Sequence, residues 1–225
     1  MWRINSLQML SLAEENYLKA IYHLSDDGAK DVLTNELADS MNTKAASVTD
    51  MIKKLSAKEL ITYKKYYGVN VTAKGKGRAL QVIRKHRLWE TFLVQKLNFT
   101  WDEVHEIAEQ LEHIRSPRLI EKLDEFLGFP TVDPHGDPIP DGKGKIKIKP
   151  QVLLDQVTEG YKGTIIAVKD SDSNLLKYLE KIGAMPGRKI QVIGKEPYDE
   201  SLEIILENQK VFVSKDVSKN ILVTE

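Results

Sequence analysis

Apolar residues recur at helical spacing in three segments near the start of the chain, which predicts three helices. Ser11 and Glu14 form a capping-box pair at the first helix, and Thr34 and Thr43 are the expected caps of the second and third. A tight turn after Asn42 would join the last two into a helix-turn-helix. The predicted helices cover residues 11–25, 34–41 and 43–55.

Two short apolar runs, residues 60–63 and 69–72, follow the third helix and are typical of β-strands. Gly68 lies between them, where a turn with positive φ is expected. A helix-turn-helix followed by such a hairpin is a winged helix-turn-helix.

Amphipathic segments then predict three further helices, at residues 73–97, 100–115 and 116–128. Thr100 with Glu103 forms a second capping box, Ser116-Pro117 opens the third segment and Gly128 closes it. The apolar faces of these helices can pack together and also form the seam of a homodimer.

Residues 129–144 are rich in Pro, Gly and Asp, which predicts an ordered loop merging into a linker. The pattern then changes to short β-type runs around one helix at residues 173–182, which predicts a small β-barrel. The expected fold class is mainly α with β. The predicted β runs are 163–168, 189–193, 202–206, 211–213 and 221–223; the predicted domains are 1–73 (winged helix-turn-helix), 74–142 (helical), a linker at 143–152, and 153–225 (β-barrel).

The formal net charge is zero, but the charges are unevenly distributed. Residues 43–87 contain twelve Lys and Arg against two acidic residues, whereas residues 88–141 contain twelve Asp and Glu against four basic residues, with three of the five histidines. This asymmetry suggests a polyanionic partner for one part of the chain and a cation for the other. The chain has no cysteine, no signal-peptide-like start and no apolar run of membrane-spanning length, so a cytoplasmic protein without membrane contact is expected.

The second helix of the helix-turn-helix carries small, polar and basic residues on its exposed turns, as expected of a helix that reads the major groove. Lysines there and on the wing would contact phosphates of double-stranded DNA. A solvated basic face on a purely structural domain is the alternative interpretation. The candidate DNA-binding residues are Lys44, Ala46, Ser47, Thr49, Asp50, Lys53, Lys54, Lys64 and Lys65.

An acidic, histidine-bearing segment supplies a candidate metal site. At helical spacing Glu109, Glu112 and His113 share one face, with His105 one turn earlier at its edge, and His86 and Glu90 on the preceding helix can project towards the same region. Oxygen-rich ligation with imidazole and without sulfur suits Mn²⁺ or Fe²⁺, although Zn²⁺ or Co²⁺ can bind in vitro. An acidic, solvent-facing helix with incidental histidines is the alternative.

Nothing in the sequence favours an enzyme. His105-Glu106 begins like a zinc-protease motif, but Glu109 stands where the second histidine would be, and no phosphate-binding glycine loop or nucleophile elbow is found.

Several segments in order closely resemble the diphtheria-toxin repressor family, in particular its manganese-dependent members of three-domain type. The resemblance covers nearly the whole chain, because residues 179–187 are similar to an SH3-like domain shared with a ferrous-transport accessory protein. It implies a winged helix-turn-helix, a helical dimerisation domain and an SH3-like β-barrel. The matching segments are residues 13–22, 47–49, 84–90, 104–113, 129–130 and 134–136.

The resemblance implies two metal sites. The first carries over to Asn16, Glu109, Glu112 and His113, where Asn16 departs from the Asp expected in a manganese sensor and the Met expected in an iron sensor. The second carries over either to His86, Glu90 and His105 or to Glu90, Asp133, His135 and Asp170, and Asp133 stands where the manganese type has Cys.

The implied mechanism is coupled binding, in which metal draws the first helix onto the dimerisation helices and selects the spacing of two recognition helices that fits a palindromic operator. Repression of metal-uptake genes is the expected outcome. Two rivals stay open at this stage: a metal-buffering or metal-delivery protein without specific DNA binding, and a winged-helix regulator whose metal ligands are vestigial.

Overall fold

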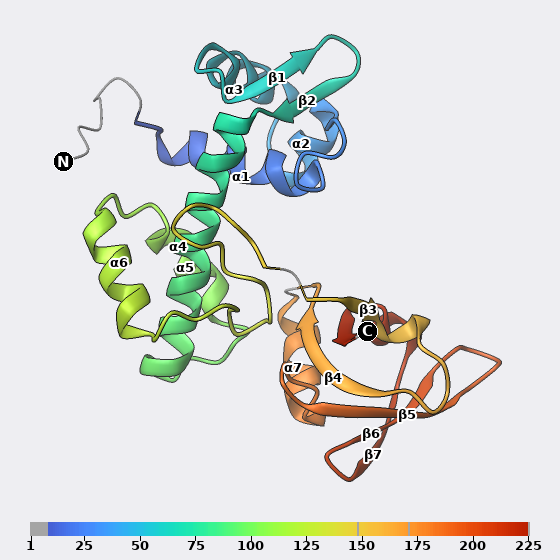
Figure 1. The fold of residues 1–225 in the computed structure, drawn as a ribbon. Helices are drawn as coiled ribbons and strands as arrows, with labels where there is room; N and C mark the ends of the chain where they lie inside the picture. Colours follow the sequence, from blue (N-terminus) through green and yellow to red (C-terminus); the bar gives the residue numbers. More distant parts are fainter. Residues whose placement is uncertain (1–8, 148, 171, 225) are drawn as a thin grey trace. The chain divides into compact units, whose positions relative to one another are not determined.

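The computed structural model describes residues 9–147, 149–170 and 172–224, which form two compact units (Figure 1). Helix α4 contributes its first half to one unit and its second half to the other. The first unit contains residues 9–85, Glu112–Arg115 and Pro140–Lys145, and the second contains His86–Leu111, Ser116–Ile139 and the described residues from Ile146 onward.

The first unit contains the predicted winged helix-turn-helix. Leu18, Ile21, Leu37, Val48 and Leu55 are fully buried in its core, so each of the first three helices buries the apolar face that its periodicity predicts. Its elements are α1 (Leu12–Leu24), α2 (Thr34–Ser40), α3 (Ala45–Ala57), β1 (Ile61–Lys64), β2 (Gly68–Val71) and the start of α4 (Ala73–Leu97).

The strands of the wing pair antiparallel, with Ile61 opposite Val71 and Lys64 opposite Gly68. Gly68 has the predicted positive φ, at 110°, and a Cβ there would lie 2.2 Å from the carbonyl oxygen of Val32. Only glycine therefore allows the wing to cross the segment before α2 at this point.

The helix caps are partly as predicted. Ser11 and Glu14 form the expected capping box, but the caps of α2 and α3 are Leu33 and Lys44, one residue away from the predicted Thr34 and Thr43. At α2 the exposed Glu36 carboxylate accepts the Leu33 N–H at 2.9 Å, which satisfies the helix end without a hydroxyl at the cap position.

The helices of the second unit are the end of α4, α5 (Val104–Leu111) and α6 (Pro117–Phe126). The side chain of Ser116 caps α6, Pro117 is its first residue and Gly128 follows it with φ 75°, all as predicted. The predicted helix over residues 100–115 is wrong at both ends, because residues 101–103 form a turn and Glu112 and His113 lie in the turn after α5.

The SH3-like part of the second unit is a six-stranded sheet in the order β3-β8-β4-β5-β6-β7. Strand β4 pairs with β5 along its first part and with β8 along its second, and the pairing with β8 contains a bulge between Ile165 and Ala167. The sequence did not predict β3, η2 or α8. The elements are β3 (Gln151–Leu153), η2 (Leu154–Gln156), β4 (Lys162–Val168), α7 (Ser173–Ile182), β5 (Lys189–Lys195), β6 (Leu202–Leu206), β7 (Gln209–Val213), α8 (Lys215–Ser218) and β8 (Ile221–Thr224).

Two apolar clusters stabilise the second unit. Leu88, Ile120 and Leu123 hold α4 and α6 together, and a larger cluster fills the SH3-like part. Trp101, from the turn before α5, belongs to that larger cluster and is only 2% exposed. The helical and SH3-like parts of this unit thus share one core. Among the described residues no helix is both long and apolar enough to span a membrane.

Candidate metal centres

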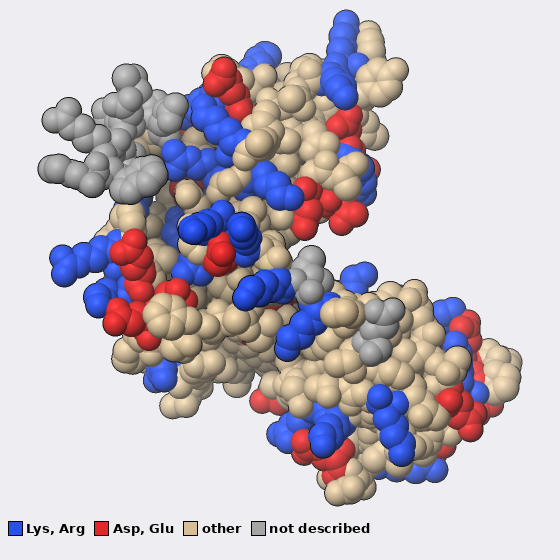
Figure 2. Space-filling model, in the orientation of Figure 1, with Lys and Arg blue, Asp and Glu red and all other residues tan. Residues whose placement is uncertain are grey.

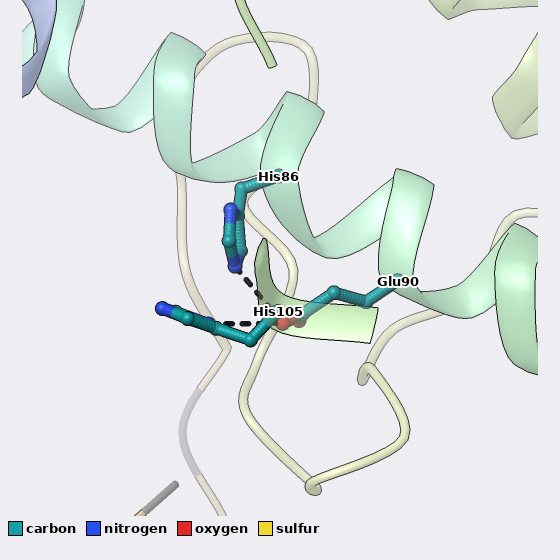
Figure 3. A group of neighbouring side chains, drawn as sticks. All are labelled: His86, Glu90 and His105. Atoms are coloured by element: carbon teal, nitrogen blue, oxygen red, sulfur yellow. Dashed lines mark hydrogen bonds and ion pairs between the residues drawn. The ribbon is translucent and has the colours of Figure 1, made fainter. Parts of the chain in front are cut away.

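A buried carboxylate surrounded by imidazoles is the central feature of the second unit (Figure 3). Glu90 is 2% exposed, and its Oε1 lies 2.9 Å from Nε2 of His86 and 3.4 Å from Nδ1 of His105. His86 and Glu90 are one turn apart on α4, so their side chains lie on the same face, while His105 comes from α5. These three residues form one group whose ligand atoms lie within 4.8 Å of one another.

A loop brings two more donors to Glu90. Nδ1 of His135 lies 3.7 Å from Glu90 Oε2 and 4.0 Å from Asp133 Oδ1, so Glu90, Asp133 and His135 form a second group with metal-compatible spacing. Glu90 belongs to both groups, with Oε1 facing the first and Oε2 the second. The structure therefore brings Glu90 together with members of both alternative second sites that the resemblance implies.

The loop at residues 133–139 is fixed from several sides. Nε2 of His135 lies 2.8 Å from the carbonyl oxygen of Trp101, and the two rings stack with centroids 5.7 Å apart. Because a carbonyl oxygen only accepts, Nε2 carries the proton and Nδ1 is the nitrogen that can ligate. Val168 of β4 donates its N–H to the His135 carbonyl at 2.9 Å. The SH3-like part therefore orients His135.

Asp133 has a structural role as well. Its Oδ1 accepts the backbone N–H groups of His135 and Asp137 at 2.8 and 3.0 Å, and its Oδ2 lies 3.5 Å from Nε of Arg87. Burial, together with the negative charges of Asp137 and Glu90, raises the pKa of Asp133 to about 7. A cation beside this carboxylate would relieve that repulsion.

The contacts among these residues also shift the pKa values of Glu90 and His135. Burial alone would raise the pKa of Glu90, but hydrogen bonds with His105, His135 and His86 outweigh it and hold the pKa far below its ordinary value. Burial alone would lower the pKa of His135, but Glu90 and Asp133 raise it to about 9. The protonated His135 imidazole thus balances part of the Glu90 charge, and a divalent cation bound at its Nδ1 would have to displace that proton.

Glu109 lies beside this cluster. Its Oε1 is 3.6 Å from Nε2 of His105 and 3.8 Å from Nδ1 of His86, all within the second unit. The sequence grouped Glu109 with Glu112 and His113 on one helical face; α5 ends at Leu111, so Glu112 and His113 lie in the turn beyond that helix.

In the first unit, Glu112 and His113 contact helix α1. Both oxygens of the fully buried Glu112 are held by Nζ of Lys19, at 2.7 and 2.8 Å, and Nδ1 of His113 lies 2.6 Å from Oε2 of Glu15. The Oδ1 of Asn16 is buried and has no hydrogen-bond partner among the described residues. A buried orphan oxygen on α1 fits the expected ligand role of Asn16.

Sequence reasoning missed Glu15 and Lys19. Their spacing of four residues on a predicted helix was the available signal, since it places them on the same side of α1. Asp170 was predicted as a ligand, but among the described residues it belongs to no metal-compatible group; it accepts the N–H of Asp172 at 3.0 Å.

The candidate DNA-binding residues lie on the exposed side of the winged helix-turn-helix. Lys44 is the N-cap residue of α3, the next six lie along it, and Lys64 and Lys65 lie on the wing; all nine are exposed. Asp50 and Lys53 form an exposed ion pair at 3.2 Å. Figure 2 shows Lys and Arg interspersed with Asp and Glu over the face in view.

Three family models match the chain. Residues 9–69 match the N-terminal DNA-binding domain of iron-dependent repressors, residues 72–141 match their metal-binding and dimerisation domain, and residues 152–225 match the FeoA domain. The iron-dependent repressor IdeR of Mycobacterium leprae (strain TN) is 29% identical over 190 residues, which are 79% of this chain and 82% of the relative.

Solved structures extend the likeness over almost the whole molecule. A manganese-dependent transcriptional repressor in complex with manganese is 32% identical, with a TM-score of 0.84, over 94% of this chain and 99% of that one. ScaR with bound Zn²⁺ is also 32% identical, with a TM-score of 0.76, over 94% and 99% of the two chains. The chain therefore belongs to the iron-dependent, or diphtheria-toxin, repressor family, whose members are metal-dependent DNA-binding transcriptional repressors and not enzymes.

Proposed function

We propose that this repressor responds to Mn²⁺ or Fe²⁺ and, as a homodimer, binds a palindromic operator that controls metal-uptake genes. The cluster around Glu90 supports this choice of metal. Its buried carboxylates and imidazoles lie close together, and the chain has no cysteine to supply sulfur. Oxygen and imidazole donors suit Mn²⁺ and Fe²⁺, and Zn²⁺ and Co²⁺ are expected to bind in vitro through their higher raw affinity.

Two metal centres are proposed. Glu90 is the ligand common to both alternative sets of the second centre, and Asn16 is the uncharged ligand of the first. The Oδ1 of Asn16 is buried without a hydrogen-bond partner among the residues that the structure describes, which supports that role. The proposed first set is Asn16, Glu109, Glu112 and His113, and the second is drawn from His86, Glu90, His105, Asp133, His135 and Asp170.

Helix α3 and the wing are proposed to contact the operator. Ser47, Thr49 and Asp50 can hydrogen-bond to base edges, Ala46 can contact a thymine methyl, and the lysines can contact phosphates. In a dimer the two α3 helices would enter successive major grooves, which requires a palindromic site. The bounds of the predicted domains and a cytoplasmic location stay predictions.

Fluorescence anisotropy tests this function, using DNA from upstream of the protein's own gene and of neighbouring transporter genes. We expect tight, sequence-selective binding with Mn²⁺ or Fe²⁺ and none with chelator. Equal binding with metal and with chelator would contradict metal sensing. Metal binding without any sequence preference on these DNAs would favour a metal-handling protein instead.

The double substitution Glu109→Ala and Glu112→Ala should abolish metal-dependent operator binding while the protein remains dimeric. Both carboxylates lie beside histidines, and their loss removes the negative charge that a divalent cation needs. Glu106→Ala, at an exposed acidic position of α5, the helix that carries Glu109, is the control and should bind as the wild type does. Unchanged metal dependence in the double variant would show that the first centre is misplaced.

A further inference from the structure

The first unit contains a buried ion pair between helix α1 and the turn after α5. Nζ of Lys19 lies 2.7 Å from Oε1 and 2.8 Å from Oε2 of Glu112. The side chain of Glu112 is fully buried and that of Lys19 is 14% exposed. At these distances the ammonium group contacts both oxygens of the carboxylate.

A second basic residue completes the charge compensation. Nζ of Lys85 lies 4.0 Å from Oε2 of Glu15, which also contacts His113 at 2.6 Å. Carboxylates that close together repel one another unless cations lie among them. Here lysine ammonium groups supply positive charge where the proposed function places a divalent metal.

We propose that Lys19 sets the metal threshold of this repressor by competing with the divalent cation for Glu112; the inference rests on the proposed first metal centre. The Lys19 ammonium group contacts both oxygens of Glu112. A divalent cation that binds one of these oxygens must displace the ammonium group from it. Lys19 must therefore withdraw, at least in part, before Glu112 becomes a metal ligand. Its flexible stem and partial exposure give it a route to solvent.

Asn16 strengthens the argument. It precedes Lys19 by three residues on α1, so the two side chains share a face of the helix, and its buried Oδ1 has no partner within the described part of the chain. A neutral ligand and a competing ammonium group both lower the attraction of this centre for a cation. The centre should then fill only when the metal is plentiful.

The test is a Mn²⁺ titration in which free Mn²⁺ is measured by its electron paramagnetic resonance signal. It compares the wild type with Lys19→Gln, Lys19→Met and Lys19→Arg, and repeats each in a Glu90→Gln background so that the first centre is observed alone. Lys58→Gln is the matched control, because Lys58 also pairs with a buried carboxylate, that of Glu14 at 2.6 Å, and its loss changes the net charge equally.

Lys19→Gln and Lys19→Met should bind Mn²⁺ at least about tenfold more tightly, because a buried carboxylate left without its partner gains more from a new cation. Lys19→Arg should bind no more tightly than the wild type, and Lys58→Gln should stay within about twofold of it. Equal or weaker binding by both neutral variants, beside normal wild-type binding, overturns the role of Lys19 and leaves the proposed function standing.

Two further outcomes are decisive. If no protein in the series binds Mn²⁺, the Mn²⁺ form of the proposed function fails and the inference with it. If Lys19→Met does not fold without metal, the Mn²⁺-dependent rise in melting temperature of Lys19→Gln replaces the titration. That rise should exceed the wild-type rise at equal Mn²⁺, and a smaller or equal rise contradicts the proposal.

Discussion

Glu14 links a helix end to a tertiary contact. Its Oε2 accepts the N–H of Ser11 at 2.8 Å as part of the α1 capping box, while its Oε1 lies 2.6 Å from Nζ of Lys58, just beyond α3. Burial alone would raise the pKa of Glu14, but Lys58 and Ser11 outweigh it and lower the pKa. A carboxyl whose pKa is lowered on folding stabilises the fold above its ordinary value of 4.5, and this stabilisation is lost as the pH falls through the folded pKa.

Glu14→Gln should therefore lower the free energy of unfolding by about 1–2 kcal/mol at pH 7. The difference from the wild type should shrink as the pH falls below the ordinary value of 4.5, because the wild-type carboxyl then becomes protonated. Urea unfolding at several pH values measures it. Glu36→Gln, which removes the exposed capping acid of α2, is the control and should cost less than about 1 kcal/mol. A Glu14→Gln effect that ignores pH would contradict the ion-pair argument.

At the scale of residues, helical spacing predicted part of the cluster around Glu90, and the resemblance to the repressor family predicted the rest of it. Helical spacing put His86 and Glu90 on one face, and the structure confirms their contact. His135 reaches the same carboxylate from a loop far along the chain, a long-range contact that no local period encodes. The Lys19–Glu112 pair is equally non-local, since 93 residues separate its members. The resemblance had grouped Glu90 with Asp133 and His135, whereas the Lys19–Glu112 pair stayed outside the sequence prediction.

At the scale of elements, the wing depends on one close approach. Gly68 opens β2 with φ 110°, beside the carbonyl of Val32. Any side chain at this position must displace backbone, because even its Cβ would lie far inside van der Waals contact. The wing and the segment before α2 are therefore packed so closely that one cannot shift without the other.

Gly68→Ala should destabilise the first unit by more than about 2 kcal/mol and weaken operator binding, since both φ and space are unfavourable. Gly77→Ala is the matched control. Gly77 lies inside α4 with nothing within 4 Å of a new Cβ, so alanine should stabilise the protein by about 0.5–1 kcal/mol. Thermal unfolding with operator-binding assays measures both. A Gly68→Ala protein as stable as the wild type would refute the close approach.

Apolar periodicity predicted the existence of the α-helices from α1 to α7 and of most strands, because each element buries a face whose spacing is set by its own geometry. Helix ends were less predictable. Helix α5 ends at Leu111 although helical spacing continues to His113, and Glu112 instead pairs with Lys19 of α1. Continuing the helix and forming this buried ion pair are alternative conformations of the residues after Leu111. Nothing in the local sequence shows which of the two is more stable.

At the scale of the whole molecule, a chain of zero net charge contains a basic segment, residues 43–87, which includes α3 and the wing and continues into α4. Attraction to DNA is set by the charges near the interface, because charges beyond about 10 Å are screened at physiological salt. The uneven distribution seen in the sequence thus predicted the DNA-binding part, whereas the total charge gave no information.

Salt dependence offers a test at this scale. Each phosphate contact contributes about 0.9 to the slope of log K against log salt concentration, so Lys64→Ala with Lys65→Ala should reduce the slope by up to about 2. Replacing Lys162, an exposed lysine of β4, by alanine should leave the slope unchanged. Anisotropy titrations between 50 and 200 mM salt, roughly the range over which counterion release is resolved, give the slopes. An unaltered slope in the double variant would remove the wing from the interface.

Trp101 has a consequence for building chimeric repressors. Its indole lies in the core of the SH3-like part although it precedes that part by some fifty residues along the chain, and its carbonyl holds the His135 imidazole. Suppose that a chimera exchanges only the residues after the linker. The transferred SH3-like part would then have a cavity where the Trp101 side chain packs, and the Trp101 of the recipient would lose its packing partners. The segment to exchange is therefore discontinuous in sequence: it must include Trp101 and residues 133–139 as well as the SH3-like part.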